Sequence, residues 1–420
     1  MPNRGPMTPT RRSLSAGLTI AAIFVGQSLG MAGIVSFPAL LPQFRQLWSL
    51  SGSEAGLISG IYFAGYIVAV PVLSALTDRL DPRRIYVVSL LCGAVTAFGF
   101  AAFADGAASA AWWRFLQGAA FGGAHMPGMQ ALCDAVPPER QTRSVAVYTA
   151  SFTVGVSLSY ALSGALAGAF GWRFGFALLA AGPLAAAATA WIVLPPLSRA
   201  AAQVSSWLPP LGAIFRNRQA LVFICAYGLH NGEVSAIRAW LVALLVFAAD
   251  RAGRQDLTGY ATLVATIANL CGTPLIVAVN ELAARWERRA VVAATMVTSA
   301  MAGVFLAAAA AWSPFVAAIA AIFAVSVATA DAGTINAGLV AASEPERRGA
   351  FLAVQAVSGF GASAVTPILF GLILDLAGGA GSEAAWIAAF AAQAVIGAVW
   401  PFAYLRNSLR GRRAMPSRAG

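Results

Sequence analysis

Six charged or imidazole side chains lie deep inside long apolar stretches of this sequence. They are Arg114, His125, His230, Glu233, Arg238 and Asp331. A charge at the centre of a bilayer costs at least about 2.5–3.5 kcal/mol, so such residues are expected to face a cavity or a partner. Carboxylates and imidazoles exchange protons, and the guanidinium fork binds carboxylates. These residues are therefore our candidates for proton coupling and anion binding.

The densest group of these residues is the stretch from His230 to Arg238, which also contains Asn231. His230 and Glu233 are three residues apart and so share one face of a helix. Glu233 lies ~20 Å from a helix start near residue 220, at 1.5 Å per residue, which is roughly mid-membrane. Glu233 is the first candidate for a protonatable coupling site, with His230 sharing the proton or orienting the carboxylate. In the alternative interpretation, Glu233 pairs permanently with Arg114 or Arg238 and only holds helices together.

The remaining polar residues in apolar stretches allow several roles. Arg114 is a candidate for proton coupling, for binding a substrate carboxylate, or for a fixed ion pair. Asp331 has no charged neighbour in sequence, so its partner is expected on another helix. His125 suits either a cavity or a packed, hydrogen-bonded position. The predicted substrate cavity comprises Gln27, Gln117, His125, Asn231, Arg238 and Asn336.

Composition indicates a membrane protein. Of the 420 residues, 59% are hydrophobic and 10% are charged, and the mean hydropathy is +0.74. A soluble domain usually carries about 25% charged residues. The net charge of +11 does not indicate nucleic-acid binding, because the arginines lie in short turns between apolar runs. The four cysteines lack metal-ligand spacing, and we expect no cofactor.

The apolar runs predict twelve transmembrane helices, each with roughly 20 or more apolar residues. Their expected ranges are 17–41, 53–76, 85–104, 108–134, 143–168, 173–195, 220–248, 257–280, 290–311, 314–342, 350–374 and 384–405. A polar segment in the middle predicts a cytoplasmic linker, 197–219, between an N-terminal half, 1–196, and a C-terminal half, 220–420. The predicted fold is thus an all-α membrane protein.

Arginine placement orients these helices. With a cytoplasmic N-terminus, 21 of the 27 arginines fall in inside segments and four fall outside. This bias predicts that both termini are cytoplasmic and that the number of spans is even. We expect a protein of the plasma membrane, the inner membrane in a bacterium.

Two landmarks recur at nearly the same spacing. The turn from Leu76 to Arg84 reads Leu-Thr-Asp-Arg-Leu-Asp-Pro-Arg-Arg, and a degenerate copy with Ala284 in place of the aspartate runs from Leu282 to Arg289, 206 residues later. Pro138-Glu139-Arg140 recurs at Pro345, 207 residues later. The offset is half the chain length and predicts a duplication. An even number of helices in each half makes the two repeats parallel.

The first turn resembles the signature Gly-x-Leu-Ala-Asp-Arg-x-Gly-Arg-Arg/Lys of the major facilitator superfamily, whose halves are six-helix parallel repeats. Ser74 replaces its first glycine, and Asp81-Pro82 replaces Gly-Arg. The resemblance implies a cytoplasmic latch, closed in the outward-facing state. Its members here are Asp78, Arg79, Arg83 and, in the second copy, Arg285.

Further resemblances concern the membrane interior. Arg114 to Gly118 resembles the family's Arg-x-x-Gln-Gly motif, whose arginine is associated with proton coupling. The Gly-Pro pair of the family's drug–proton antiporters is missing from 155–164. The family lines its central cavity with the first and fourth helix of each half, and the six buried charged or imidazole residues lie in three of these four.

The sequence thus predicts a secondary active transporter that works by alternating access. We expect proton coupling and favour a small organic anion as substrate, carried by a monomer in the lipid bilayer. One alternative is efflux of drugs or metabolites by proton antiport. Another is a membrane sensor that does not transport. An enzyme is not expected, because no nucleotide-binding loop or catalytic triad pattern is present.

Overall fold

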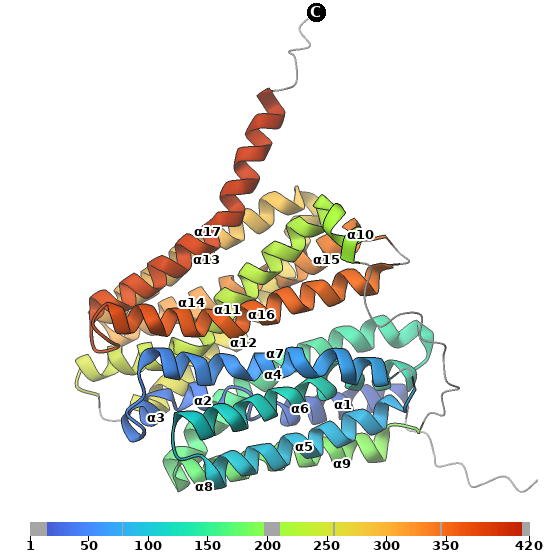
Figure 1. Cartoon of the computed structure of the whole chain (residues 1–420), viewed down its shortest axis with the longest axis horizontal. Helices are drawn as coiled ribbons and strands as arrows, with labels where there is room; N and C mark the ends of the chain where they lie inside the picture. Colours follow the sequence, from blue (N-terminus) through green and yellow to red (C-terminus); the bar gives the residue numbers. More distant parts are fainter. Residues whose placement is uncertain (1–14, 78, 197–210, 255–256, 345–346, 414–420) are drawn as a thin grey trace, which may run out of the picture.

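The computed structural model describes residues 15–77, 79–196, 211–254, 257–344 and 347–413, and within these ranges the chain is mainly α-helical (Figure 1). The N-terminal helices are α1 (Ala16–Gly30), α2 (Ser36–Ala39), α3 (Leu41–Leu47), α4 (Gly52–Leu76), α5 (Pro82–Phe103), α6 (Ala107–Asp134), α7 (Pro138–Phe170), α8 (Trp172–Leu179) and α9 (Ala181–Val193). The C-terminal helices are α10 (Leu211–Arg216), α11 (Arg218–Arg251), α12 (Leu257–Arg285), α13 (Arg288–Trp312), α14 (Pro314–Ala330), α15 (Ala332–Ala342), α16 (Arg348–Leu376) and α17 (Glu383–Arg413).

Ten helical stretches among the described residues are long and apolar enough to cross a membrane. The α1 helix is apolar but shorter, with 15 residues. The α6 helix has 28 residues, but it carries Arg114, Gln117 and His125, which lower its hydropathy. Both occupy positions where the sequence predicts spans, so the count of twelve stays a prediction. Large apolar side chains such as Val68, Val95 and Ile192 are exposed, as expected for surfaces that contact lipid.

Three of the expected continuous helices are interrupted. The range 17–41 is not one helix, because α1 ends at Gly30 and a turn from Met31 to Val35 precedes the short α2. Pro38 and Pro42 disfavour a continuous helix here, since proline has no backbone N–H to donate. The range 314–342 is divided at Asp331, between α14 and α15, and the range 173–195 at Ala180.

Capping side chains define where several helices begin. Ser51 and Glu54 form a reciprocal capping box at the start of α4, in which each side chain accepts from the other's backbone N–H. The carboxylate of Asp81 accepts from the N–H of Arg83 at 3.0 Å, with Pro82 at the first helical position of α5. The side chain of Asn217 similarly caps α11. The turns that separate the apolar runs therefore also encode the helix starts.

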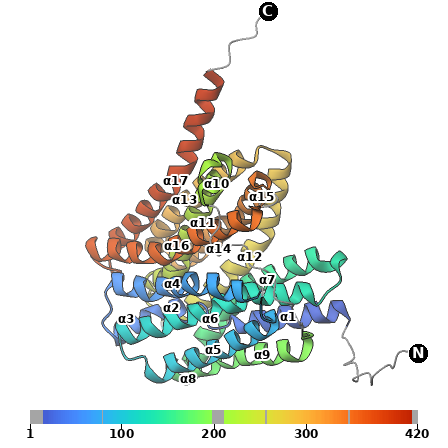
Figure 2. The ribbon, with the colours of Figure 1, turned by 45° about the vertical axis from the view of Figure 1, so that its right-hand side comes forward.

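The N-terminal helices α1–α9 and the C-terminal helices α11–α17 pack against each other mainly along two pairs. The α4 helix lies beside α16, and α7 lies beside α12 (Figures 1 and 2). We call the end of the molecule that carries α3 and the start of α4 the α3 end. The opposite end, where α9 stops at Val193 and α10 starts at Leu211, is the linker end. Stacked and edge-on rings of Phe37, Phe44 and Phe100 consolidate the α3 end.

Candidate functional site

A buried acid–imidazole pair joins α11 to the break in helix 314–342. The Nδ1 atom of His230 lies 2.7 Å from Oδ1 of Asp331, and both side chains are buried. Asp331 occupies the junction between α14 and α15, where the helix is interrupted. Broken helices within the membrane commonly form the binding or coupling sites of transporters. The structure therefore supplies the partner on another helix that the sequence led us to expect for Asp331.

Glu233 lies on the same face of α11 as His230, but its hydrogen-bond partner is a hydroxyl group. Ser299 of α13 donates a hydrogen bond to Oε1 of Glu233 at 2.6 Å. Both residues are buried, with exposed fractions of 5% for Glu233 and 2% for Ser299. Sequence reasoning missed Ser299, because α13 also carries Thr295 and Thr298 and nothing in the sequence distinguishes one hydroxyl from the others.

Neither buried arginine pairs with Glu233 among the described residues. Arg114, on α6, donates from Nη2 to the carbonyl of Ile34 at 2.7 Å and from Nη1 to Oε1 of Gln117 at 2.8 Å. Its guanidinium also lies 4.5 Å from the ring centroid of Tyr62. The acceptor carbonyl of Ile34 belongs to the turn that interrupts helix 17–41. Arg114 thus fastens the broken first helix to α6, and most of its donors are occupied by the protein itself.

Arg238 has a different environment, at the contact between the N-terminal and C-terminal helices. Its Nε donates to Oδ1 of Asn269, on α12, at 3.1 Å, and its guanidinium lies 5.7 Å from the ring centroid of Phe152, on α7. Tyr160, also on α7, donates to the backbone carbonyl of Arg238 at 2.6 Å. The side chain is half-buried, and within the described part of the chain its two terminal nitrogens donate no hydrogen bond. Asn269 and Phe152 were not predicted from the sequence.

His125 also lies beside Phe152. Its ring is 6.0 Å from that of Phe152, 5.8 Å from that of Tyr148 and 5.4 Å from that of Phe121. Its Nδ1 atom is buried without a hydrogen-bond partner in the described residues. His125 is therefore neither a fully satisfied packed histidine nor a member of the His230–Asp331 group. It flanks the same ring as Arg238, from α6.

The other residues predicted for the cavity are dispersed. Gln27 is deeply buried and accepts a hydrogen bond from the Tyr86 hydroxyl at 2.8 Å, whereas Asn231 is half-buried and donates to the Tyr227 carbonyl of its own helix. Asn336 is exposed on α15, and no side-chain contact joins it to the buried group among the described residues. Gln117 accepts a hydrogen bond from Arg114 through its Oε1, and its Nε2 donates to the carbonyl of Thr96.

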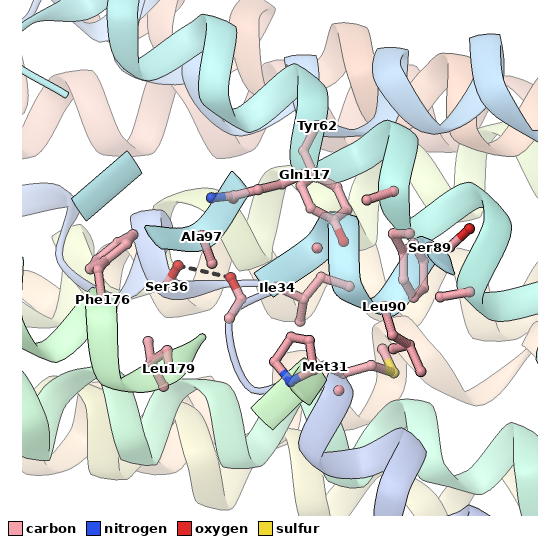
Figure 3. A pocket seen from close by; sticks show the side chains of 17 residues that line it. Met31, Ile34, Ser36, Tyr62, Ser89, Leu90, Ala97, Gln117, Phe176 and Leu179 are labelled. Carbon is pink, nitrogen blue, oxygen red and sulfur yellow. Dashed lines mark hydrogen bonds between the residues drawn. The ribbon is translucent and has the colours of Figure 1, made fainter. Parts of the chain in front are cut away.

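A small cavity of about 50 Å³ lies beside the contact between Arg114 and Gln117, within the N-terminal helices. Its walls include Tyr62, Gln117, Ser89 and Met31, and Figure 3 shows these side chains around it, together with the hydrogen bond that Ser36 donates to the Gly33 carbonyl. One water needs about 10–15 Å³ on this measure. The space fits a few water molecules and is too small for an organic substrate.

The predicted latch is only partly described. Asp78 lies outside the described residues. Arg83 is buried, donates from Nη2 to the Trp191 carbonyl of α9 and lies 4.2 Å from the centroid of the Trp191 ring. Arg79 and Arg285 are exposed. Arg83 therefore holds α5 to α9 within the N-terminal helices in this conformation.

Solved structures with the same fold are transporters. A bacterial homologue of the human lysosomal transporter Spinster, in an inward-facing and unoccupied conformation, superimposes with a TM-score of 0.74 at 16% identity, covering 96% of this chain and 99% of the other. A mutant of the nucleoside transporter NupG gives 0.75 at 15% identity, covering 93% and 99%. No curated protein matched the chain in sequence.

The family is established by a match that covers more than half of the sequence. Residues 18–268 match the family model described as Major Facilitator Superfamily. This range includes the turn after α4, the arginine motif of α6 and the polar stretch of α11. It agrees with the helical fold, with the apolar spans and with the transporter structures that superimpose on the chain. The chain belongs to the Major Facilitator Superfamily.

Proposed function

We propose that this protein is a proton-coupled secondary transporter that carries a small organic anion by alternating access. Two six-helix halves, 1–196 and 220–420, rock against each other around the site, joined by the linker 197–219. The arginine distribution supports a cytoplasmic linker end and cytoplasmic termini. We propose a monomer in a plasma membrane, the inner membrane in a bacterium.

The observation that carries proton coupling is the neutral partner of Glu233. An arginine beside a buried carboxylate favours the ionised form and opposes protonation. A serine hydroxyl can donate to a carboxylate or accept from a carboxylic acid, so it serves both protonation states. Glu233 has such a partner in Ser299, and it lies one helical turn from the His230–Asp331 pair. The three titratable groups form one buried cluster in the C-terminal helices.

The test of coupling is uptake into proteoliposomes driven by a pH gradient. We expect Glu233→Gln to bind substrate but to lose accumulation against the concentration gradient, because an amide cannot carry the proton. Glu383→Gln is the matched control, since Glu383 is a partly exposed acid paired with Arg251 at 3.7 Å at the α3 end. Unchanged accumulation by the Glu233→Gln protein would remove Glu233 from the mechanism.

The observation that favours an anionic substrate is Arg238. It is half-buried between α7, α11 and α12, where both halves contribute side chains, and no carboxylate pairs with it among the described residues. A desolvated guanidinium without a carboxylate is a good partner for a ligand carboxylate. Asn269 contacts it directly, and His125 contacts the same Phe152 ring, so both offer polar atoms near this position. Arg114 is a weaker candidate, because backbone carbonyls and Gln117 already occupy it.

The test of anion binding uses thermal stabilisation of the purified protein by small mono- and dicarboxylates. A ligand that binds only the folded protein raises its apparent stability. We expect Arg238→Gln to raise the Kd of the stabilising anion about 10- to 100-fold, as for loss of a charged hydrogen bond. Arg173→Gln is the control, because Arg173 donates only to backbone carbonyls such as that of Ala101 among the described residues. Stabilisation by organic cations alone would contradict the proposal and favour efflux.

A further inference from the structure

The two halves are joined at the α3 end by a carboxylate. Oδ1 of Asp375, in the last turn of α16, accepts a hydrogen bond from the backbone N–H of Gly52 at 2.6 Å. Oδ2 of the same residue accepts from the N–H of Ser53 at 2.8 Å. Both donors belong to the first turn of α4. The pair therefore connects a C-terminal helix to an N-terminal helix across more than 300 residues of sequence.

Asp375 completes the cap of α4. The first N–H groups of any helix lack partners within it. The capping box satisfies the N–H groups of Ser51 and Glu54, and it leaves those of Gly52 and Ser53 without an acceptor inside the N-terminal helices. The positive end of the helix dipole further favours an anion at this position. The cap of α4 is thus complete only while α16 is in place.

Glycines let the two helices approach closely at this point. A Cβ on Gly56 would lie 2.1 Å from the carbonyl oxygen of Pro367, and one on Gly60 would lie 2.1 Å from that of Ala364. A Cβ on Gly371 would lie 2.0 Å from the carbonyl oxygen of Gly52. No side chain can fit between such backbones. The hydrogen bonds of Asp375 therefore sit at the end of a backbone contact that depends on glycine.

One more charge acts on this contact from α3. Burial lowers the pKa of Arg45, and the nearby Asp375 carboxylate opposes that shift. Arg45 also donates from Nε to the carbonyl of Leu50, just before the cap of α4. Glu54 is exposed and engaged with Ser51. The Asp375 carboxylate thus interacts with the Arg45 cation of α3 as well as with two backbone N–H donors of α4.

The contacts between α4 and α16 do not continue to the linker end. After the glycines, the last contacts in that direction are the rings of Phe63 and Tyr66 against Phe360, with centroids 6.0 Å and 4.3 Å apart. Among the described residues, the hydrogen bonds from α7 to the C-terminal helices likewise involve Ser157 and Tyr160, in the half of α7 toward the α3 end. Among the described residues, these hydrogen bonds and ring contacts between the halves thus lie toward the α3 end, where a hollow of about 680 Å³ remains between α3, α7 and α12.

We propose that Asp375 and the start of α4 form a releasable clamp that closes the transporter at the α3 end. In this conformation the clamp is engaged. When the halves rock to open that end, α16 leaves α4, the cap is lost, and water replaces the carboxylate at the two N–H groups. The clamp thereby biases the protein toward the state open at the linker end. It depends on neither the substrate nor the coupling ion.

The test measures the distances at both ends of the protein with pairs of spin labels. The four native cysteines are first replaced by serine. Phe170 and Leu376, which are exposed, report the α3 end, and Arg143 and Trp286, which are also exposed, report the linker end. We expect Asp375→Asn to increase the ratio of molecules open at the α3 end to molecules closed there about tenfold. The substitution removes the negative charge and one of the two hydrogen-bond acceptors. The linker-end distance should shorten in the same molecules.

Two control variants separate the clamp from general destabilisation. Gly56→Ala places a methyl group against the Pro367 carbonyl and should shift the distances in the same direction as Asp375→Asn, whereas Gly361→Ala, with nothing within 4 Å of its Cβ, should leave them unchanged. Glu383→Gln removes an acid at the same end that pairs within the C-terminal helices and should also be silent. Unchanged distances in Asp375→Asn, with native thermal stability, would overturn the proposal.

Discussion

At the scale of single residues, the buried polar groups differ in the partners that they contact, and their positions in the sequence do not predict these partners. Asp331 is isolated in its apolar stretch and Arg238 belongs to the polar stretch of α11, yet Asp331 is the one that meets a residue of that stretch, His230, whereas Arg238 meets the Asn269 amide and the Phe152 ring. Glu233 meets the hydroxyl of Ser299. A buried carboxyl with a neutral partner can change its protonation state without leaving an unpaired opposite charge behind. The partner of each group thus decides what it can do.

Ser299 provides a test at this scale. We expect Ser299→Ala to lower the initial rate of pH-driven uptake about tenfold and to displace its pH profile, because the Glu233 carboxyl loses a hydrogen bond of about 1.5–3 kcal/mol. Ser299→Thr keeps the hydroxyl and should restore both. Thr298→Ala is the control, since the Thr298 hydroxyl donates to the Ala294 carbonyl of its own helix. An unchanged profile in the alanine variant would leave Ser299 without a role in coupling.

At the scale of helices, the interruptions determine where the polar groups meet. The turn after α1 exposes the Ile34 carbonyl to Arg114, and the break at Asp331 brings its carboxylate to His230. Glycine and proline made a weak helix predictable near residues 30–42, but an apolar run looks the same whether or not it is interrupted. The break at Asp331 is followed by Gly333, but a single glycine within an apolar run does not distinguish an interrupted helix from a continuous one.

Arg114 provides the test at this scale. We expect Arg114→Gln to lower the free energy of unfolding by about 1–3 kcal/mol, because the buried Ile34 carbonyl loses its donor. The measurement is the Tm of the purified protein, with exposed Arg285→Gln as the control. The Kd of the stabilising anion should change little in the folded fraction. A raised Kd with an unchanged Tm would instead make Arg114 a substrate-binding residue.

At the scale of the whole molecule, the N-terminal and C-terminal helices follow similar sequence landmarks but carry different buried charged residues. The turn that recurs after 206 residues and the Pro138 motif that recurs at Pro345 after 207 residues indicate a duplication. The acids buried deep in the apolar stretches, Glu233 and Asp331, however, lie in the C-terminal half, and Arg114 lies in the N-terminal one. The halves also meet unevenly, since among the described residues the hydrogen bonds and ring contacts of α4 with α16, and the hydrogen bonds of α7 with the C-terminal helices, lie toward the α3 end. In our proposals, proton exchange and the control of access thus belong to different parts of the molecule.

The class of protein, the family resemblance and the helices that carry the buried charges could be predicted from the amino-acid sequence. These follow from hydropathy, periodicity and short motifs, which are local properties of the chain. The hydrogen bonds of Ser299 with Glu233, of Arg238 with Asn269 and of Asp375 with the start of α4 could be identified only in the packed structure. Each of these pairs joins two different helices, and a side chain's partner is set by how the helices pack. For the same reason, the sequence indicated that a site existed among the buried polar residues but not which of them form it.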